Sequence, residues 1–444
     1  MAIVASFASY ELNPGTSSTF GSGFNVLCTV VGTGLLQLPY GGAQSGWFGA
    51  FFLTILCVMA LYTAVVLIKC LALMEQISKS ENKVSHDVQQ EENDAEVALH
   101  SDAHAKAPPL SFGDIGEAAF GQLGKWAVIV QMHLTLTMVA TIYNLLAGLN
   151  LVTVMGSVWP FLREENGENY AVLIIAGVVW FHVFLKTLSE VEIVSWLNMV
   201  ITIAMEIIVI CVALTSPPKD QAHTTALVTD MSSLGGAFAS FAFAYGVHPI
   251  LPTVYRNMKH PEKYNLMITA AFSAVAVAYL CMFFVGYGVY GDEVVTPIYN
   301  VPSMKDNAVV KVIVAFLTLH LLGAYAIVIN PPERALESTL RVDRMKLALL
   351  WRILLRTGFV ALTAVVSITV GIKNFGPFLD LVSSFTSSFT QFIFPVLFYL
   401  KLATKAGVKV SIVEWAWNGL ILVVAVIGST YGTINAVKEL KSVF

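Results

Sequence analysis

The amino-acid sequence predicts an all-α integral membrane protein that crosses the bilayer about eleven times. Of its 444 residues, 56% are hydrophobic and only 12% are charged, whereas soluble domains carry about 25% charged residues. The charges are also unevenly distributed, because the apolar stretch 193–214 contains a single charged residue, Glu206. This pattern is typical of membrane-spanning helices and argues against a water-soluble fold.

Eleven apolar segments are each long enough to cross about 30 Å of hydrocarbon. They lie at about 20–45, 48–75, 123–152, 170–187, 192–214, 232–256, 264–290, 307–330, 347–372, 376–400 and 411–436. Turn and loop signals separate these segments, including Gly46, Pro160, Pro217–Pro218, Pro261 and Gly376–Pro377.

The distribution of basic residues predicts the orientation of the chain. With the N-terminus in the cytosol, 18 of the 25 Lys and Arg residues fall in cytosolic segments and 7 on the other side. Cytosolic loops carry such an excess of Lys and Arg. We therefore expect residues 1–19 to form a cytosolic tail, 20–402 the helical core, and 403–444 helix eleven with a short C-terminal tail. Segment 76–111 is polar and is predicted to be a disordered cytosolic loop.

Two spans contain helix-weakening residues in mid-membrane. The first span carries Gly32-Thr33-Gly34, and the sixth carries Gly246 followed by Pro249. A glycine inside a helix costs up to about 1 kcal/mol relative to alanine. These spans open two five-helix halves, about 20–214 and 232–400, and paired interruptions indicate an inverted-repeat secondary transporter with helix eleven as an accessory. The alternative is that the glycines only permit close helix packing.

An interrupted helix suits an amino acid ligand. The half that follows the break presents free backbone N–H groups, and its positive dipole end favours a carboxylate. The halves that end at the breaks offer carbonyl oxygens to an ammonium group. Unpaired backbone at that depth is tolerated only where it lines a cavity. The predicted binding residues are Thr29, Gly32, Thr33, Gly34, Tyr143, Tyr245 and Gly246, and the aromatic residues expected to close the site also include Phe243 and Tyr325.

Ionisable side chains inside the spans are candidates for ion coupling, because each costs several kcal/mol unless it is paired or hydrated. They are His133, His182, Glu206, His248 and His320. We favour His320 and then His248, since both are expected near the breaks and imidazole titrates in the physiological range. Hydrogen bonding to a neighbouring helix is the alternative for each histidine, and Glu206 is either a second proton carrier or a partner of a polar group across the bundle.

Several motifs follow one another at a specific spacing along residues 22–402. They are Asn25–Cys28, Gly34–Tyr40, Gly46–Trp47, Gly113–Gly121, Gly246–Pro261 and Asn330–Glu337. In these motifs the chain resembles the amino acid/auxin permease family, and within it the vesicular inhibitory amino acid and vacuolar amino acid transporters. The resemblance implies an eleven-helix permease of the inverted-repeat type, driven by an ion gradient, usually of protons.

Three positions bear on how far the resemblance extends. Asn25 matches a position that helps to bind sodium in some sodium-coupled relatives, although an asparagine can also hold helices together. Members commonly have a serine where this chain has Tyr245, and often a small polar residue or asparagine where it has His320. Thr318 is the only hydroxyl near His320 in span eight, so we prefer proton coupling to sodium coupling.

These observations predict a secondary active transporter of amino acids that works by alternating access around the two breaks. We expect no catalytic group, metal site, cofactor or nucleic-acid partner, with an ion gradient as the energy source and a monomer as the functional unit. The competing functions are a sodium-coupled symporter and an amino acid sensor that signals through segment 76–111. The expected location is the vacuolar, lysosomal or plasma membrane.

Overall fold

The computed structural model describes residues 15, 17–92, 111–184, 191–218 and 222–441. Within these ranges the regular secondary structure is helical, apart from an isolated bridge between Ser17 and Met258. Ten of the described helical segments are long and apolar enough to cross a membrane, and a further apolar helix, Met199–Thr215, is shorter. The all-α membrane fold is confirmed, whereas the count of eleven crossings stays a prediction.

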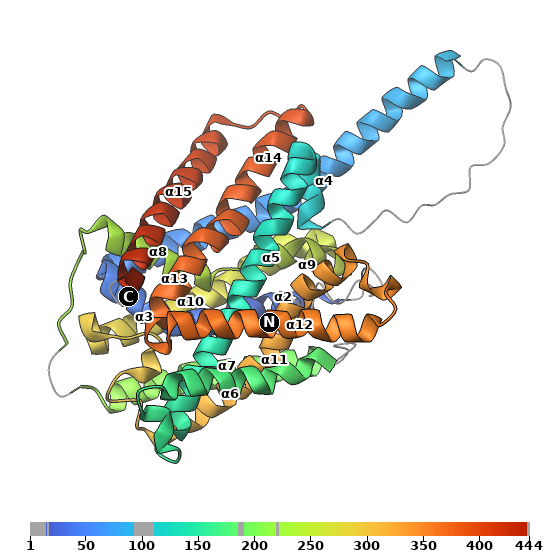
Figure 1. Cartoon of the computed structure of the whole chain (residues 1–444). Coiled ribbons are helices and arrows are strands. Elements are labelled where there is room, and N and C mark those ends of the chain that lie inside the picture. Colours follow the sequence, from blue (N-terminus) through green and yellow to red (C-terminus); the bar gives the residue numbers. More distant parts are fainter. Residues whose placement is uncertain (1–14, 16, 93–110, 185–190, 219–221, 442–444) are drawn as a thin grey trace.

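The first half of the chain comprises five helical units (Figure 1). They are α2 (Thr19–Val30) with α3 (Leu38–Ser45), α4 (Phe48–Glu92), α5 (Phe112–Met155), α6 (Gly167–Trp180) and α7 (Val191–Thr215). The backbone of α4 stays helical to Glu92, although we expected disorder from residue 76, because adding turns to an existing helix avoids the cost of nucleation. Residues 93–110 of that segment, and residues 1–14 of the N-terminal tail, lie outside the described residues.

The second half repeats this order and adds one helix. Its units are α8 (Met231–Ala244) with α9 (Leu251–Asn257), α10 (Tyr264–Tyr290), α11 (Ala308–Thr339), α12 (Ala348–Val370), α13 (Phe375–Val382) with α14 (Phe394–Lys405), and finally α15 (Ile412–Lys441). Two π-helical turns, Ser383–Ser387 and Phe389–Ile393, connect α13 to α14. Such turns are rare and often mark functional sites.

The first and sixth units run antiparallel to each other. The Ser17 N–H donates to the Asn257 carbonyl at one end (2.9 Å), and the Trp47 N–H donates to the Thr225 carbonyl at the other (2.9 Å). The start of each unit therefore lies beside the end of the other. We call the end with Ser17 the N-terminal face and the end with Trp47 the C-terminal face, where α15 also ends with Lys438 beside Ser232.

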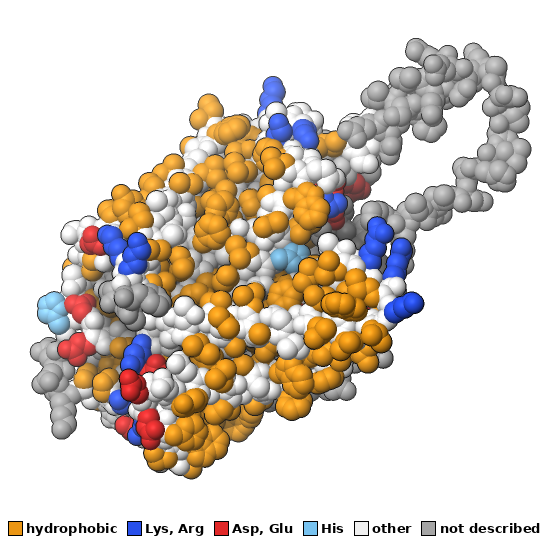
Figure 2. Space-filling model, viewed as in Figure 1, with side chains coloured by type: hydrophobic (Ala, Val, Ile, Leu, Met, Phe, Trp, Pro, Cys, Tyr) orange, Lys and Arg blue, Asp and Glu red, His pale blue; other side chains and the backbone are white. Residues whose placement is uncertain are grey.

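Hydrophobic side chains cover the outer surface between these two faces, and the charged side chains gather at the ends (Figure 2). Large apolar residues are exposed on many of the outer helices, among them Val178, Val277, Leu319, Val365 and Val423. An apolar belt of this kind matches the hydrocarbon core of a bilayer.

Candidate functional site

The first span is interrupted between Val30, where α2 ends, and Thr33, where a short 3₁₀ helix to Gln37 begins. The first N–H groups of a helical segment have no partner within it. A Cβ atom at Gly34 would lie only 2.8 Å from the Cα of Ala244. Glycine is needed at position 34 because the two interrupted spans touch there.

The sixth span is interrupted after Ala244, where α8 ends, and a 3₁₀ turn begins at His248. The Tyr279 hydroxyl lies 2.7 Å from the Val30 carbonyl and 2.7 Å from the Ala244 carbonyl, the last residues of the two helices. Tyr279 of α10 therefore bridges both breaks. The sequence analysis did not single it out, because one tyrosine in an apolar span carries no distinguishing signal.

A cavity of about 90 Å³ lies at the two breaks. Its walls come from α2, α5, α7, α8, α11 and the residues that follow each break. Of the residues predicted for the site, it is lined by Thr29, Gly32, Thr33, Gly34, Tyr143, Gly246, His248 and His320, together with Phe243.

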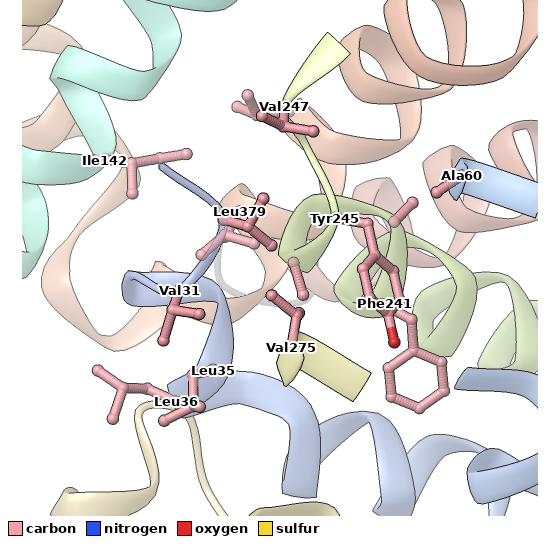
Figure 3. Close-up of a cluster of buried hydrophobic side chains, with 14 of the residues drawn as sticks. Val31, Leu35, Leu36, Ala60, Ile142, Phe241, Tyr245, Val247, Val275 and Leu379 are labelled. Atoms are coloured by element: carbon pink, nitrogen blue, oxygen red, sulfur yellow. The ribbon is translucent and has the colours of Figure 1, made fainter. Parts of the chain in front are cut away.

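Three predicted residues lie outside this lining. Tyr245 is buried in a hydrophobic cluster (Figure 3), and its hydroxyl donates to the Leu53 carbonyl at 3.3 Å. Its side chain therefore packs away from the cavity. Glu206 is half-buried on α7, and Asn25 is exposed on α2. Among the aromatic residues expected to close the site, Tyr325 instead hydrogen-bonds to Thr363 (2.7 Å).

Two histidines contribute ionisable groups to the cavity wall. His248 follows the break in the sixth span, and His320 lies on α11. The Nε2 atom of His248 lies 3.1 Å from the Ala60 carbonyl and 2.9 Å from the Thr63 hydroxyl. A carbonyl only accepts, so Nε2 carries the proton and the ring is anchored to α4. Its Nδ1 is buried and has no hydrogen-bond partner among the described residues, which leaves an acceptor beside the cavity.

The π-helical segment forms a polar part of the wall that the sequence analysis missed. Ser387, Thr390 and Gln391 line the cavity there. Gln391 is 1% exposed, and neither its amide oxygen nor its amide nitrogen has a partner among the described residues. A buried amide left unpaired costs about 1–3 kcal/mol per polar group, which a ligand could compensate. The run of Ser and Thr before Gln391 in an apolar span was the available signal.

Comparison with known proteins identifies the family. The family model described as transmembrane amino acid transporter protein matches residues 15–89 and 96–438. The chain belongs to this family. The family expected from the motifs is thus confirmed, and the protein is a transporter rather than an enzyme.

Individual relatives agree with this assignment. The chain is 28% identical over 403 residues to the Arabidopsis thaliana protein named amino acid transporter AVT1I, covering 88% of this chain and 87% of the relative. It is 26% identical over 430 residues to amino acid transporter AVT1D of the same plant, covering 95% and 69%. The crystal structure of MhsT in complex with L-phenylalanine superposes with a TM-score of 0.51 at 12% identity, covering 96% of this chain and all of that one. The transporter therefore has the inverted-repeat fold.

A buried carboxyl group lies outside the cavity of the transporter, between the cavity and the C-terminal face. Asp380 of α13 is 1% exposed, and its side chain accepts hydrogen bonds from Ser240 (2.8 Å) and Gln44 (3.3 Å). We call these three residues the Asp380 cluster. The sequence analysis missed Asp380, although the rule that found Glu206 applies to it equally, since both are acids inside an apolar span.

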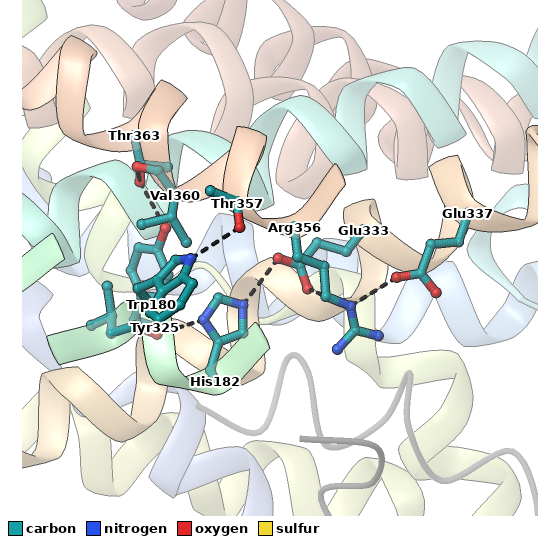
Figure 4. A network of polar contacts seen from close by, with 10 residues as sticks. Trp180, His182, Tyr325, Glu333, Glu337, Arg356, Thr357, Val360 and Thr363 are labelled. Atoms are coloured by element: carbon teal, nitrogen blue, oxygen red, sulfur yellow. Dashed lines mark hydrogen bonds and ion pairs between the residues drawn. The ribbon is translucent and has the colours of Figure 1, made fainter. Parts of the chain in front are cut away.

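A second buried carboxyl group joins α11 to its neighbours near the N-terminal face (Figure 4). The Glu333 side chain lies 3.0 Å from His182 and 3.8 Å from the Arg356 guanidinium, which also contacts Glu337 at 2.7 Å. We call these four residues the Glu333 cluster. His182 therefore belongs to an ion-pair network and not to the cavity wall.

Proposed function

We propose that the transporter binds its amino acid substrate in the cavity at the two breaks and couples its movement to protons. The observation that carries this proposal is the cavity itself, which unites the free ends of two antiparallel interrupted helices. The N–H groups that begin the 3₁₀ segment at Thr33 suit the substrate carboxylate. The Val30 carbonyl, at the end of α2 in the cavity wall, keeps one lone pair beyond its bond with Tyr279 for the ammonium group.

The residues that line the cavity favour a substrate with a small, uncharged side chain. Its lining contains no Asp, Glu, Lys or Arg, so a charged substrate side chain would be buried without an ion partner, which is costly. One enclosed water needs about 10–15 Å³, so the cavity has room for roughly six to nine waters. That corresponds to the heavy atoms of a small or medium amino acid.

Proton coupling is supported by the titratable groups at the cavity. His320 and His248 both line it, and imidazole can change its charge in the physiological pH range. Sodium coupling would need additional oxygen ligands from span eight. Thr318, the hydroxyl closest in sequence to His320 in that span, does not line the cavity. We therefore assign the coupling ion to the proton, and His320 remains the preferred coupling residue.

The proposal also covers the orientation of the transporter in the membrane and its assembly. The excess of Lys and Arg in the predicted cytosolic segments supports an N-terminal face in the cytosol. The C-terminal face then meets the lumen of an acidic compartment or the outside of the cell. The cavity is built within one chain, which supports a functional monomer that needs no cofactor beyond the gradient.

Counterflow of a panel of labelled amino acids in proteoliposomes tests the function. We expect exchange of small uncharged amino acids, and accumulation under an imposed pH gradient but not under a sodium gradient. Sodium-driven accumulation that ignores pH would refute proton coupling. Binding without exchange would identify a sensor.

The substitution Gly34→Val tests the site. Its side chain would collide with the Ala244 backbone and separate the two breaks, so we expect at least a tenfold loss of counterflow. Gly177→Val is the matched control, because a Cβ there meets nothing within 4 Å. Preserved counterflow in Gly34→Val would contradict the site assignment.

The substitution His320→Ala tests the coupling residue. We expect the accumulation driven by a pH gradient to fall several-fold, because the cavity loses its titratable group on α11. The control is His133→Ala, the same replacement outside the cavity, since His133 bonds to the Ile129 carbonyl and does not line the cavity. An unchanged pH response in His320→Ala would exclude His320 from coupling.

A further inference from the structure

The Asp380 carboxyl group ties together three helices that stand between the cavity and the C-terminal face. Ser240 of α8 donates its hydroxyl proton to Oδ1 at 2.8 Å, and the Gln44 amide of α3 donates to Oδ2 at 3.3 Å. α3 follows the first break and α8 precedes the second. These are therefore the halves of the interrupted spans that close the cavity on this side.

No cation compensates the charge of Asp380 among the described residues, where no Lys, Arg or His nitrogen lies within 4.0 Å of it. The elements packed against α13 are α5, α8, α15, the π-helical turn and the 3₁₀ turn Ile372–Asn374, whose exposed Lys373 lies 3.8 Å from Glu168. α8, α3 and the π-helical turn contain no charged residue. An uncompensated carboxylate inside the membrane is costly.

The remaining titratable groups on those elements are few. α5 has no Asp, Glu, Lys or Arg after Lys125, and its titratable residues beyond that point are His133 and Tyr143. α15 carries Glu414 at its start and Tyr431, Lys438, Glu439 and Lys441 toward its end, and the Lys438 ammonium group lies 3.2 Å from the Ser232 hydroxyl. α3 carries Tyr40, whose hydroxyl lies 3.4 Å from Glu439. A negative Glu439 disfavours a negative Asp380. Binding a proton removes both the burial cost and this repulsion.

A string of polar groups connects Asp380 with the C-terminal face. The Gln44 and Asn435 amides lie side by side, since a Cβ at Gly236 would be 2.6 Å from one and 2.9 Å from the other. Asn435 donates to Glu439 at 2.8 Å, and Glu439 is partly exposed near the end of α15. This string offers a polar route for protons from that face.

The Asp380 carboxyl group also lies close to the cavity. Ser240 precedes the cavity residue Phe243 by one helical turn, and Asp380 precedes Ser387 by two turns, about 10 Å along the helix axis. A change in the hydrogen bonds of Asp380 therefore acts on the helices that form the cavity wall.

Both protonation states of Asp380 have hydrogen-bond partners. The ionised carboxylate accepts from Ser240 and Gln44. A protonated carboxyl group needs an acceptor, and the Gln44 amide oxygen is buried with no partner among the described residues. Turning the Gln44 amide would place that oxygen against the new O–H. Gln44 can thus serve as donor in one state and as acceptor in the other.

We propose that Asp380 is a proton-binding group of the transport cycle, reached from the C-terminal face. In its ionised form it holds α3 and α8 against α13, and taking up a proton weakens this contact so that the cavity opens to that face. The inference rests on the proposed function, because it needs a proton-driven cycle. It adds a second proton site to the histidines at the cavity.

The substitution Asp380→Asn tests the inference in proteoliposomes with labelled substrate. Each coupled proton allows about a tenfold accumulation per pH unit of gradient, because one pH unit corresponds to a tenfold ratio. We expect Asp380→Asn to lose this factor of about ten, and its counterflow to lose the part of its pH dependence that Asp380 contributes, while the part due to the histidines remains. Asp380→Glu should recover part of the pH response, since it restores a titratable group.

Two further variants separate proton binding from a structural role. Ser240→Ala removes a donor to the ionised carboxylate, which favours the protonated form, so the pH of half-maximal counterflow should rise by about half to one unit. Glu333→Gln is the matched control, because it removes another buried acid of the same membrane domain, and its pH response per folded molecule should stay that of the unmodified protein.

The outcomes distinguish this inference from the proposed function. Absence of counterflow in the unmodified transporter would refute the proposed function. Proton-driven accumulation that is as large in Asp380→Asn as in the unmodified transporter, or an unmoved pH profile in Ser240→Ala, would overturn only the role of Asp380. If Asp380→Asn does not fold, the Ser240→Ala profile alone decides.

Discussion

The transporter buries two carboxyl groups in different ways, one in the Asp380 cluster and one in the Glu333 cluster. Glu333 faces His182 at 3.0 Å and Arg356 at 3.8 Å, and it joins α11 and α12 to the 3₁₀ turn Phe181–Phe184 that follows α6. Asp380 is held only by the neutral donors Ser240 and Gln44, and it joins α3, α8 and α13. The two acids are equally buried but differ in whether a positive charge accompanies them.

This difference indicates two roles for buried charge in one protein. A carboxylate paired with a buried cation stays ionised, and removing either partner leaves the other charge uncompensated. A carboxyl group that has only neutral donors has no cation to keep it ionised, so it can gain or lose a proton and change the contacts that it makes. The Glu333 cluster therefore fixes the packing of helices outside the breaks, and the Asp380 cluster lies on helices of the interrupted spans, which must move relative to one another.

The substitution Arg356→Leu should have the largest effect on stability. It removes the guanidinium that faces both Glu333 and Glu337, and breaking a buried ion pair in this way costs about 3–5 kcal/mol. Thermal unfolding in detergent measures the loss. Arg344→Leu is the control, because Arg344 is exposed at the same end of the protein. An equal Tm for the two variants would contradict the structural role of the cluster.

The substitution Glu333→Gln should have a smaller effect. Arg356 keeps its 2.7 Å contact with Glu337, so we expect a loss of about 1–3 kcal/mol from the weakened bond with His182. The pH-driven accumulation per folded molecule should be retained. A lost pH response here, together with a normal one in Asp380→Asn, would reverse the comparison between the two clusters.

The substitution Gly236→Ala probes the Asp380 cluster without changing its residues. The added methyl group would lie 2.6 Å from the Gln44 amide nitrogen and push it away from Asp380. Losing that donor favours the protonated form, so the pH of half-maximal counterflow should rise by up to about one unit. Gly419→Ala, where a Cβ meets nothing within 4 Å, should leave the profile unmoved. A shift equal to that of Gly419→Ala would show that Gln44 does not act on Asp380.

The substitution Lys311→Ala should have the smallest effect and shows what an exposed pair contributes. The Lys311 ammonium, 3.1 Å from Asp306, lowers the pKa of that carboxyl group. The folded protein therefore favours ionised Asp306 above the ordinary carboxyl pKa, and this contribution disappears as the pH falls below it. Asp306 is 71% exposed, and exposed pairs contribute little. We expect no measurable difference in Tm between Lys311→Ala and the unmodified protein at pH 7 or at pH 3. A clear difference at pH 7 that disappears at pH 3 would show that surface pairs matter as much as the buried clusters.

Much of the candidate site could be predicted because its residues have local signatures. Gly32, Gly34 and Gly246 weaken helices wherever they occur in a span, and His248 and His320 are costly in any apolar segment. The cavity brings all five together. Tyr245 was harder to place, since the direction of its side chain depends on how the chain turns at the break, and the cavity receives the neighbouring Phe243 instead.

The residues that were missed depend on contacts between distant segments. Tyr279 matters only because its hydroxyl reaches Val30 and Ala244 from another helix. Gln391 stands out only because the π-helical turn places it in the cavity wall without a partner. Asp380 could have been found as an acid in an apolar span, but its lack of a cation could not.

The sequence by itself determined the membrane class, the approximate positions of most helices, the two interruptions and the family, because hydropathy, glycine, proline and motif spacing are properties of short segments. Only the tertiary structure decided which buried charge is compensated. The sequence does not show which groups surround Glu333, just beyond the predicted span 307–330, or Asp380, inside the predicted span 376–400. Helix packing brings His182 and Arg356 to one and only Ser240 and Gln44 to the other, and the free energy of a buried charge depends on those neighbours.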